Sequence, residues 1–352
     1  MEKEVMTIRF GFFLSIILSF LILLNSCNTE KQVEDPFVIN GSTMGTYYTV
    51  KIVKNDSLFT KEYYESLKNR IDSVLYIVNR QMSTYMEDSE ISIFNSFQDT
   101  GWFPISYDFA YVVKTALDIS AKTDTALDIS VGPLVNLWGF GPGKDRLNKL
   151  PDSLEIKNLL SLVGIGKLDI RLKPPSIKKA IPEMYIDLSS IAKGFGVDKV
   201  SELLTDDNHN NFMVEIGGEV FARGSNHLNS PWKIGISTPN ETMGIKKILS
   251  IDNFAVATSG DYRNFISIDN KIYSHTIDPR TGWPIRHNLA SVTVIHSKCM
   301  VADGFATAFE VLGAERSIKL AEKMKLPVYL IVRDDNEFIE YMTQEFTNFV
   351  IE

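Results

Sequence analysis

The chain has 352 residues, of which 44% are hydrophobic and 23% are charged, and its formal net charge is −8. This length suffices for one large or two ordinary globular domains, and the composition excludes a largely disordered chain. Nucleic-acid-binding proteins are normally basic, so the acidic balance argues against that class. The only two cysteines are Cys27 and Cys299, which excludes a disulfide framework and a zinc site built from four cysteines.

The first 27 residues have the pattern of a secretory signal. Two basic residues precede a predominantly apolar run from Phe10 to Leu24, which is shorter than the roughly 20 residues of a membrane-spanning helix. The run ends in Leu24-Asn25-Ser26-Cys27, which resembles the lipobox of bacterial lipoproteins. We therefore expect cleavage before Cys27, lipidation of its thiol, and a membrane-attached mature protein on the extracytoplasmic side. An ordinary signal peptide or a short anchor is the alternative.

The rest of the chain is predicted to be a short tether followed by a folded α+β domain. Residues 28–36 are polar and suit a flexible tether, and residues 37–352 hold the folded part. Strands and helices do not alternate as in a doubly wound fold, and no Gly-x-Gly-x-x-Gly follows a strand. No Walker loop is present either. A nucleotide-binding site of either common type is therefore not expected.

Alternation, apolar periodicity and turn residues predict the elements in chain order. A glycine-punctuated turn over Gly41–Gly45 comes first. In the first half of the chain we expect a strand at Thr46–Val53, helices within Thr60–Arg80 and at Tyr107–Lys122, a rigid loop at Val131–Gly143, a short helix within Pro151–Leu162 and a turn at Pro174–Pro175. A helix opened by Asp187–Gly196 follows, and then strands at Phe212–Ile216, Glu219–Arg223 and Trp232–Ser237 and a hairpin of Phe265–Ile268 with Lys271–His275. The last expected elements are a strand at Ala290–His296, helices at Met300–Leu312 and Ala314–Lys325, and strands at Val328–Val332 and Phe338–Met342.

Asp303 and Thr307 are candidate ligands of a metal ion. They are four residues apart at a predicted helix start, so their side chains lie on one face, one turn apart. Carboxylate and hydroxyl oxygens suit Mg²⁺ better than zinc, and Mg²⁺ in proteins often also binds substrate phosphate oxygens. The alternative is structural: Asp303 caps its own helix and Thr307 bonds back to it.

A second candidate site is the turn from His275 to Gly282. His275 ends a predicted strand, and Asp278-Pro279-Arg280-Thr281-Gly282 has the composition of a turn. A histidine can act as a general base near neutral pH, and an arginine can hold a phosphate in its planar fork. A plain turn with a surface arginine is the alternative.

Three further residues are weaker candidates when taken alone. Lys193 lies at a glycine-flanked helix opening, where backbone N–H groups favour an anion, and it contacts a phosphate or is simply solvated. Met44 and Tyr85 are candidate contacts for a flat ring, although such residues more often only fill the core or the surface.

Eight sequence blocks stand in one order along the chain: Gly41–Thr46, Met82–Asn95, Ala126–Gly141, Asp187–Gly194, Val214–Gly218, Thr258–Arg263, His275–Gly282 and Ala302–Thr307. In this order they resemble the FAD:protein FMN transferases, the ApbE-like flavin transferase lipoproteins. Each block alone is weak, but the set in register is specific.

The resemblance implies a two-lobed α+β fold related to the T-fold, with antiparallel sheets, packed helices and FAD between the lobes. The family's flavin and adenine contacts fall on Met44, Tyr85, Ala126, Leu127, Asp128, Asp187, Lys193 and Ile277. Its Mg²⁺ ligands fall on Asp303, Thr307 and the backbone carbonyl of Ser190. His275 is the expected base, and Arg280 remains a candidate phosphate contact.

The implied reaction joins FMN from FAD to a Thr or Ser hydroxyl of a partner protein and releases AMP. The family's partners are extracytoplasmic subunits of membrane electron-transfer complexes. A Mg²⁺-dependent FAD pyrophosphatase, in which water replaces the hydroxyl, would use the same site. A non-catalytic lipoprotein that binds flavin is a further alternative, and a purely structural lipoprotein leaves these blocks unexplained.

Overall fold

The computed structural model describes residues 35–53, 60–142, 149–239, 244–260, 265–269, 271–335 and 337–351. Pro36–Glu352 forms one compact unit. The predicted signal, Cys27 and most of the tether lie outside the described residues, as does the end of the Thr258–Arg263 block. Within the described ranges, no helix combines the length and apolar character needed to cross a bilayer.

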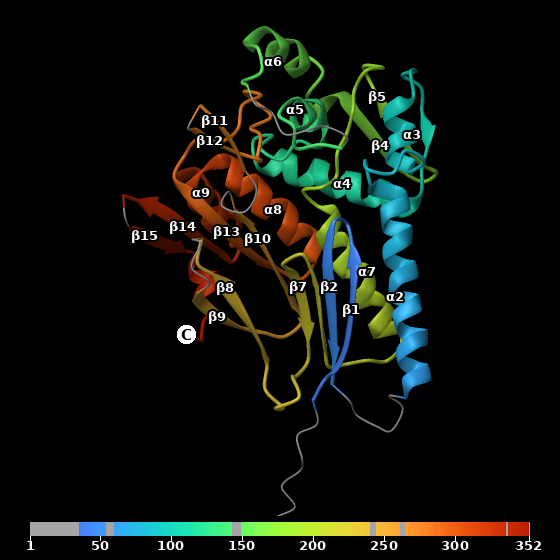
Figure 1. Ribbon diagram of the computed structural model, residues 1–352, viewed down its shortest axis with the longest axis vertical. Helices are drawn as coiled ribbons and strands as arrows, with labels where there is room; N and C mark the ends of the chain where they lie inside the picture. The colour runs from blue at the N-terminus through green and yellow to red at the C-terminus, as the bar shows by residue number, and fades with distance from the viewer. Residues whose placement is uncertain are drawn as a thin grey trace, which may run out of the picture. The chain divides into compact units, whose positions relative to one another are not determined.

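An eight-stranded antiparallel sheet is the centre of the fold (Figure 1), with the strand order β1-β2-β6-β7-β10-β13-β14-β15. Its strands are β1 (Phe37–Thr43), β2 (Thr46–Ile52), β6 (Phe212–Ile216), β7 (Glu219–Arg223), β10 (Phe254–Gly260), β13 (Leu289–His296), β14 (Val328–Asp334) and β15 (Glu337–Met342). The smaller sheets are β3 (Phe103–Pro104) with β5 (Pro175–Lys179) and β4 (Leu168–Leu172), β8 (Trp232–Ser237) with β9 (Ile245–Ile251), and β11 (Phe265–Ile268) with β12 (Lys271–Ser274).

Helices cover one face of the large sheet. The helices are α2 (Lys61–Met82), α3 (Glu90–Ser96), α4 (Tyr107–Lys122), α5 (Gly132–Leu137), α6 (Ser153–Leu160), α7 (Ala192–Asp206), α8 (Cys299–Leu312), α9 (Ala314–Met324) and α10 (Gln344–Thr347). On that face α2 contacts β1, α7 contacts β6 and β7, α8 contacts β10 and β13, and α9 contacts β14. Helix α4 packs on the outer side of α8 and against β4 and β5.

The opposite face of the sheet carries its own apolar cluster, which includes Trp232 of β8, Leu249 of β9 and Phe346 of α10. With both faces covered, every residue of β13 from Leu289 to Ile295 is buried. Neither side of this strand faces solvent, so its polar residues Ser291 and Thr293 are buried together with its apolar ones. Burial on both sides fixes the position of β13 and of α8, which follows it.

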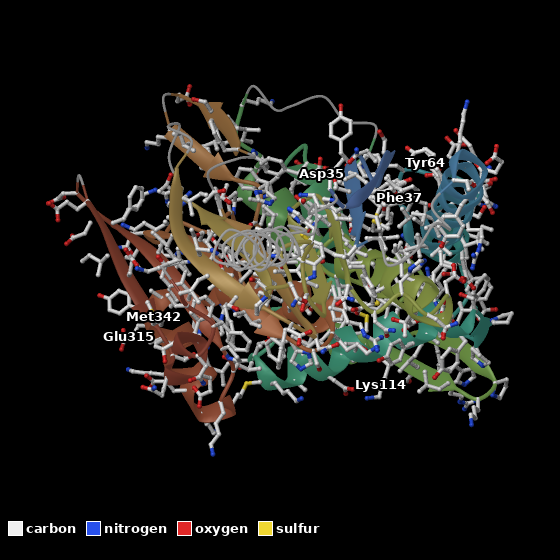
Figure 2. The ribbon with its side chains drawn as sticks, turned by 90° about the horizontal axis from the view of Figure 1, so that it is seen from below. Asp35, Phe37, Tyr64, Lys114, Glu315 and Met342 are labelled. Carbon is white, nitrogen blue, oxygen red and sulfur yellow. The ribbon has the colours of Figure 1, made fainter. Side chains whose placement is uncertain are left out.

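Helix α2 shows how local sequence sets one edge of this arrangement. Its N-cap Thr60 accepts a hydrogen bond from the backbone N–H of Tyr63 at 3.2 Å. Its buried residues, which recur at helical spacing, are Leu67, Ile71, Leu75, Val78 and Met82. At the sheet edge, Phe37 of β1 packs edge-on against Tyr64 of α2, with ring centroids 5.5 Å apart (Figure 2).

The predicted α+β class with antiparallel sheets is confirmed. The helix at Tyr107–Lys122 has the predicted bounds, and Pro174 lies in the turn between β4 and β5. The division into tether and two-lobed domain stays a prediction. Sequence patterns gave no indication of β1, β3, β4, β5, β9, β10, α3 and α10.

Two local predictions were wrong. A rigid loop was expected at Val131–Gly143, but the 3₁₀ turn Ile129–Val131 leads directly into helix α5. Pro133 does not prevent this helix, because it occupies the first turn, where its missing backbone N–H is not needed. Gly41 belongs to β1 rather than to a turn. It pairs with Tyr48 across the hairpin, and a Cβ at Gly41 would lie 2.3 Å from the tyrosine ring, so only glycine leaves room for that ring.

Candidate active site

Two tight turns of the large sheet meet the start of α7. The β1–β2 turn has positive φ at Met44 (50°) and Gly45 (71°), and the β6–β7 turn has it at Gly217 (62°) and Gly218 (107°). A Cβ at Gly217 would lie 2.9 Å from Thr46 Cγ2 and 3.5 Å from Lys193 Cδ. Two of the predicted site residues, Met44 and Lys193, are therefore held at one end of the sheet.

Lys193 lies between two buried carboxylates on different elements. Its Nζ is 2.7 Å from Glu219 Oε1 at the start of β7 and 3.8 Å from Asp303 Oδ1 in α8. Burial alone would lower the pKa of Lys193, but the Asp303 and Glu219 carboxylates together raise it well above its usual value. Burial of two carboxylates around one ammonium raises the pKa of Asp303 and that of Glu219, the latter to about 7. The alternative of a simply solvated lysine was wrong, because Lys193 forms an ion pair with Glu219.

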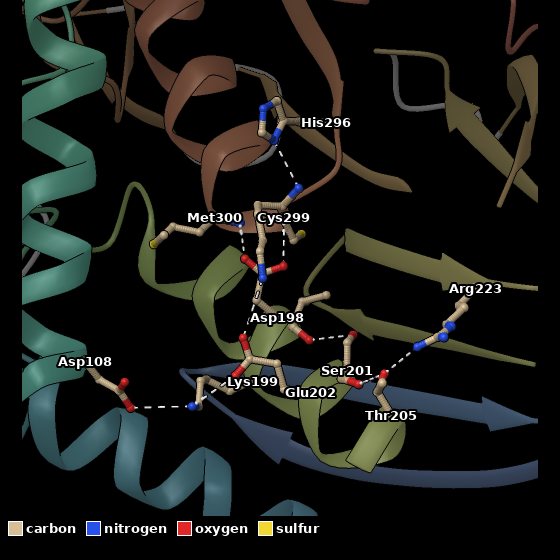
Figure 3. Close-up of polar contacts among 12 residues, drawn as sticks. Asp108, Asp198, Lys199, Ser201, Glu202, Thr205, Arg223, His296, Cys299 and Met300 are labelled. Carbon is tan, nitrogen blue, oxygen red and sulfur yellow. Dashed lines mark hydrogen bonds and ion pairs between the residues drawn. The ribbon is translucent and has the colours of Figure 1, made fainter. Parts of the chain in front are cut away.

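Helices α7 and α8 are joined by two reciprocal hydrogen-bond contacts. The backbone N–H of Gly194, in the first turn of α7, donates to Asp303 Oδ2 at 2.9 Å. Conversely, Asp198 of α7 accepts from the N–H groups of Cys299 and Met300, in the first turn of α8, at 2.8 and 3.0 Å (Figure 3). Each helix start is therefore capped by an aspartate of the other helix.

This helix contact depends on a glycine. A Cβ at Gly194 would lie 2.5 Å from the Cys299 carbonyl oxygen and 2.8 Å from Met300 Cα. Both are backbone atoms, so no side-chain movement could relieve the clash. Asp303 itself is the fifth residue of α8, and Lys298 is the N-cap. The alternative in which Asp303 caps its own helix is therefore wrong.

The oxygen ligands available at and near Asp303 suit a hard cation. Asp303 Oδ1 makes no hydrogen bond within the described part of the chain, and Thr307 lies one turn further along α8. None of the described residues donates to the carbonyl of Ser190, because the N–H four residues later, that of Gly194, bonds to Asp303 instead. Carboxylate, hydroxyl and carbonyl oxygens are the ligands that Mg²⁺ accepts. No three His, Cys, Asp or Glu of the described residues form a metal cluster, and this ligand set needs only one carboxylate.

A second group of predicted residues lies around Phe140. The hydroxyl of Tyr85, a residue that is 69% exposed, is 3.5 Å from the Phe140 carbonyl oxygen. The Phe140 ring meets His275 edge-on, with ring centroids 6.2 Å apart. The structure therefore brings Tyr85 and His275, which are far apart in sequence, into contact with the same residue, Phe140.

The loop that carries Asp187 is fixed by its neighbours. The backbone N–H of Asp187 donates to the Ile129 carbonyl at 2.7 Å, and Asp187 Oδ1 accepts a hydrogen bond from the backbone N–H of Ser189. One residue earlier, Ile186 forms two hydrogen bonds with the Asn95 side chain, at 2.8 and 2.9 Å. These contacts connect the Asp187 loop, which leads to Ser190 and α7, to the preceding helices.

The segment Ala126–Asp128 is buried and internally bonded. Asp128 accepts from the N–H and hydroxyl of Ser130 through Oδ1 and from the N–H of Ile165 through Oδ2. Leu127 packs next to Gly304, the neighbour of Asp303. The Asp128 carboxylate therefore holds the segment in shape, and its role as a flavin contact stays a prediction.

The His275–Gly282 turn is a compact unit. Asp278 accepts from Arg280 through the backbone N–H, Nε and one Nη, at 2.7–2.9 Å. Two of the five guanidinium N–H donors are thus used within the turn, and the others remain for a phosphate. Trp138 Nε1 donates to the Gly282 carbonyl at 2.9 Å, and Ile277 is buried in the same cluster.

Glu219, Asp198 and Asn95 contribute to this region, and sequence reasoning gave none of them a role. The described residues also form an open groove of about 580 Å³, lined by His287, Asn288, Leu312, Gly313, Ala314, Glu315, Arg316, Ile318, Val332 and Tyr341. It includes none of the predicted site residues. The convergent charges around Lys193 identify the candidate site better than the size of this groove.

Comparison with known proteins gives the family. The ApbE family model matches residues 44–330. The chain belongs to the ApbE family. The FAD:protein FMN transferase of Haemophilus influenzae is 42% identical over 336 residues, which cover 94% of this chain and 95% of that protein. The FAD:protein FMN transferase of Vibrio cholerae is also 42% identical, over 95% of this chain and 98% of that protein.

Solved ApbE structures have the same fold. The flavin transferase ApbE from Vibrio cholerae superposes with a TM-score of 0.82 at 42% identity, over 90% of this chain and 99% of that chain. The ApbE protein from Thermotoga maritima gives a TM-score of 0.79 at 25% identity, over 90% of this chain and all of that chain. The predicted family and ApbE-like fold are confirmed.

Proposed function

We propose that this ApbE protein transfers FMN from FAD to a Thr or Ser hydroxyl of an acceptor protein, with Mg²⁺ as cofactor and AMP as the second product. The observation that carries the proposal is the meeting of Lys193 and Asp303 at the start of α7, the helix that follows Ser190. It is supported by relatives named FAD:protein FMN transferase that match over nearly the full length.

The proposed reaction is a displacement at the FMN-side phosphorus of FAD. The acceptor hydroxyl oxygen forms the new P–O bond, the pyrophosphate P–O bond breaks, and AMP leaves with the bridging oxygen. Mg²⁺ held by Asp303, Thr307 and the Ser190 carbonyl would neutralise charge on the phosphates. Lys193 would bind a phosphate oxygen, and His275 would take the hydroxyl proton.

The base role of His275 is tested by His275→Ala. General acid–base catalysis typically contributes about 10²–10⁴-fold, so flavin transfer should slow by that range while FAD still binds. His209→Ala is the matched control, because His209 bonds to Tyr63 rather than packing on Phe140. A His275→Ala protein that flavinylates its acceptor at the normal rate would remove His275 from the mechanism.

The acceptor distinguishes the proposal from its alternatives. The pure protein is incubated with FAD and Mg²⁺, with and without an acceptor that has a flavinylation sequence. AMP release that needs the acceptor supports transfer, and release of AMP and FMN without it shows a pyrophosphatase. FAD binding with no AMP in either case shows a flavin-binding protein without catalysis.

We also propose that the protein is lipidated on Cys27 and acts at the extracytoplasmic side of a membrane. The support is the signal pattern and the lipobox-like Leu24–Cys27. The acceptors would then be extracytoplasmic subunits of membrane electron-transfer complexes. Cys27→Ser should move the protein from the membrane fraction to the soluble fraction. Unchanged membrane attachment of this variant would contradict lipidation at Cys27.

A further inference from the structure

Three charged side chains lie together where β7, α7 and α8 meet. The Lys193 ammonium is bonded to Glu219 at 2.7 Å and is only near Asp303, at 3.8 Å. The side chains of Glu219 and Asp303 are 4% and 7% exposed, so water screens this cluster weakly. The position of the ammonium between the two carboxylates therefore matters to any cation that binds Asp303.

Glu219 is fixed in place by the sheet. It is the first residue of β7 and pairs with Ile216 of β6 across the tight Gly217–Gly218 turn. Its Oε1 holds Lys193, while its Oε2 is buried and has no hydrogen-bond partner among the described residues. A buried carboxylate oxygen without a donor is costly, which favours a role for Glu219 beyond packing.

We propose that Glu219 is a positioning residue of the metal site: it holds the Lys193 ammonium away from Asp303 and so leaves the Asp303 carboxylate available to Mg²⁺. Without the Glu219 charge, Asp303 is the remaining carboxylate that the structure places beside Lys193, and an ammonium paired with it competes with the metal. This inference rests on the metal site of the proposed function.

Metal binding tests the inference without turnover. Mn²⁺ prefers the same oxygen ligands as Mg²⁺, and the free ion has an EPR signal, so it can be titrated into metal-free protein without FAD. The titration is done at about pH 8, above the pKa of about 7 to which burial raises Glu219. Loss of a residue that orients a metal ligand costs about 10–100-fold in affinity, which is the weakening expected for Glu219→Gln.

Glu215→Gln is the matched control. Glu215 lies four residues earlier in the same hairpin and pairs with Val220, and the structure shows no contact between its side chain and Lys193. It loses the same charge by the same substitution, and its Mn²⁺ affinity should be that of the wild type.

A double variant separates positioning from a simple field effect. In Lys193→Met the competing ammonium is absent, so adding Glu219→Gln should change Mn²⁺ affinity by less than about threefold, because the effect acts through Lys193. If Glu219→Gln weakens Mn²⁺ binding by the same factor in the wild-type protein and in Lys193→Met, the effect does not act through Lys193. Only the negative charge of Glu219 then matters, and the inference is overturned.

Glu219→Asp gives an independent result if the glutamine variant does not fold. It keeps the charge but retracts the carboxylate by one methylene, so Lys193 is no longer held and Mn²⁺ should bind more weakly. Wild-type affinity in this variant would overturn the inference. A wild-type protein that binds no Mn²⁺ would instead refute the metal site itself.

Discussion

At the scale of single residues, the two reciprocal aspartates both cap the start of the facing helix but have different surroundings. Asp303 accepts one backbone N–H at the start of α7, and Asp198 accepts two at the start of α8. Of the two, only Asp303 also faces the Lys193 ammonium. We therefore expect Asp303 to act in metal binding and Asp198 to act in folding, although both are buried aspartates on paired helices.

Substituting both with asparagine tests this division. Asp303→Asn keeps an amide oxygen for Gly194 but loses the charge, so Mg²⁺ binding and flavin transfer should fall by at least about tenfold. Asp198→Asn keeps one of two cap bonds and should lower the free energy of unfolding by about 1 kcal/mol with little change in Mg²⁺ affinity. Magnesium titration and urea unfolding measure the two effects. Equal loss of Mg²⁺ affinity in both variants would contradict the division.

At the scale of elements, the close contact of α7 and α8 would fix the geometry of the proposed metal site. Gly194→Ala would place its Cβ 2.5 Å from the Cys299 carbonyl and push the helices apart. Overpacking of this kind costs about 1–3 kcal/mol, and Mg²⁺ affinity should fall with it. Gly166→Ala is the control, because a Cβ there meets no atom within 4 Å. Urea unfolding that shows no difference between the two variants would contradict this account of the helix contact.

Sequence patterns predicted the parts of this fold that depend on local periodicity. The i, i+4 spacing of Asp303 and Thr307 is visible because both residues lie on one helix. The roles of Glu219 and Asp198 were not visible, because they depend on which strand and helix lie beside α7. Periodicity within one element carries no information about its neighbours.

The hexapeptide Thr-Ala-Leu-Asp-Ile-Ser occurs twice in the chain and shows the same limit. Its first copy, Thr115–Ser120, lies inside α4, and its second, Thr125–Ser130, forms a turn and a 3₁₀ start. In the second copy Asp128 bonds to Ile165, which is distant in sequence. Tertiary contacts therefore decide the structure of this peptide, and local propensity does not.

At the scale of the whole molecule, metal binding and stability should be linked to pH through the Lys193 cluster. Burial raises the pKa of Glu219 to about 7 in the metal-free fold, against roughly 4.3 in an unfolded chain. A carboxyl group whose pKa is higher in the fold than in the unfolded chain stabilises the fold at pH values below its unfolded pKa. This contribution is lost as the pH rises through the folded pKa, which is about 7 for Glu219. Asp198, with a pKa raised by burial to about 6, acts in the same direction.

The metal-free protein should therefore lose stability between about pH 5 and pH 8, while the stabilisation by saturating Mg²⁺ grows over the same range, since the cation needs ionised carboxylates. Thermal unfolding with and without Mg²⁺ measures both curves. Glu219→Gln removes this carboxyl group, so the thermal stability of the metal-free variant should change less with pH than that of the wild type. A Mg²⁺ stabilisation that is the same at both ends of the range would contradict this linkage.

The central claim is that this protein joins FMN to another protein through chemistry at the FAD pyrophosphate. Intact-mass measurement of a co-expressed acceptor tests it most directly. The acceptor mass should rise by one FMN minus one water, and the rise should disappear when the acceptor Thr or Ser is replaced or when Asp303 is changed to Ala. An acceptor of unchanged mass, with free FMN and AMP accumulating in the same mixture, would contradict the claim.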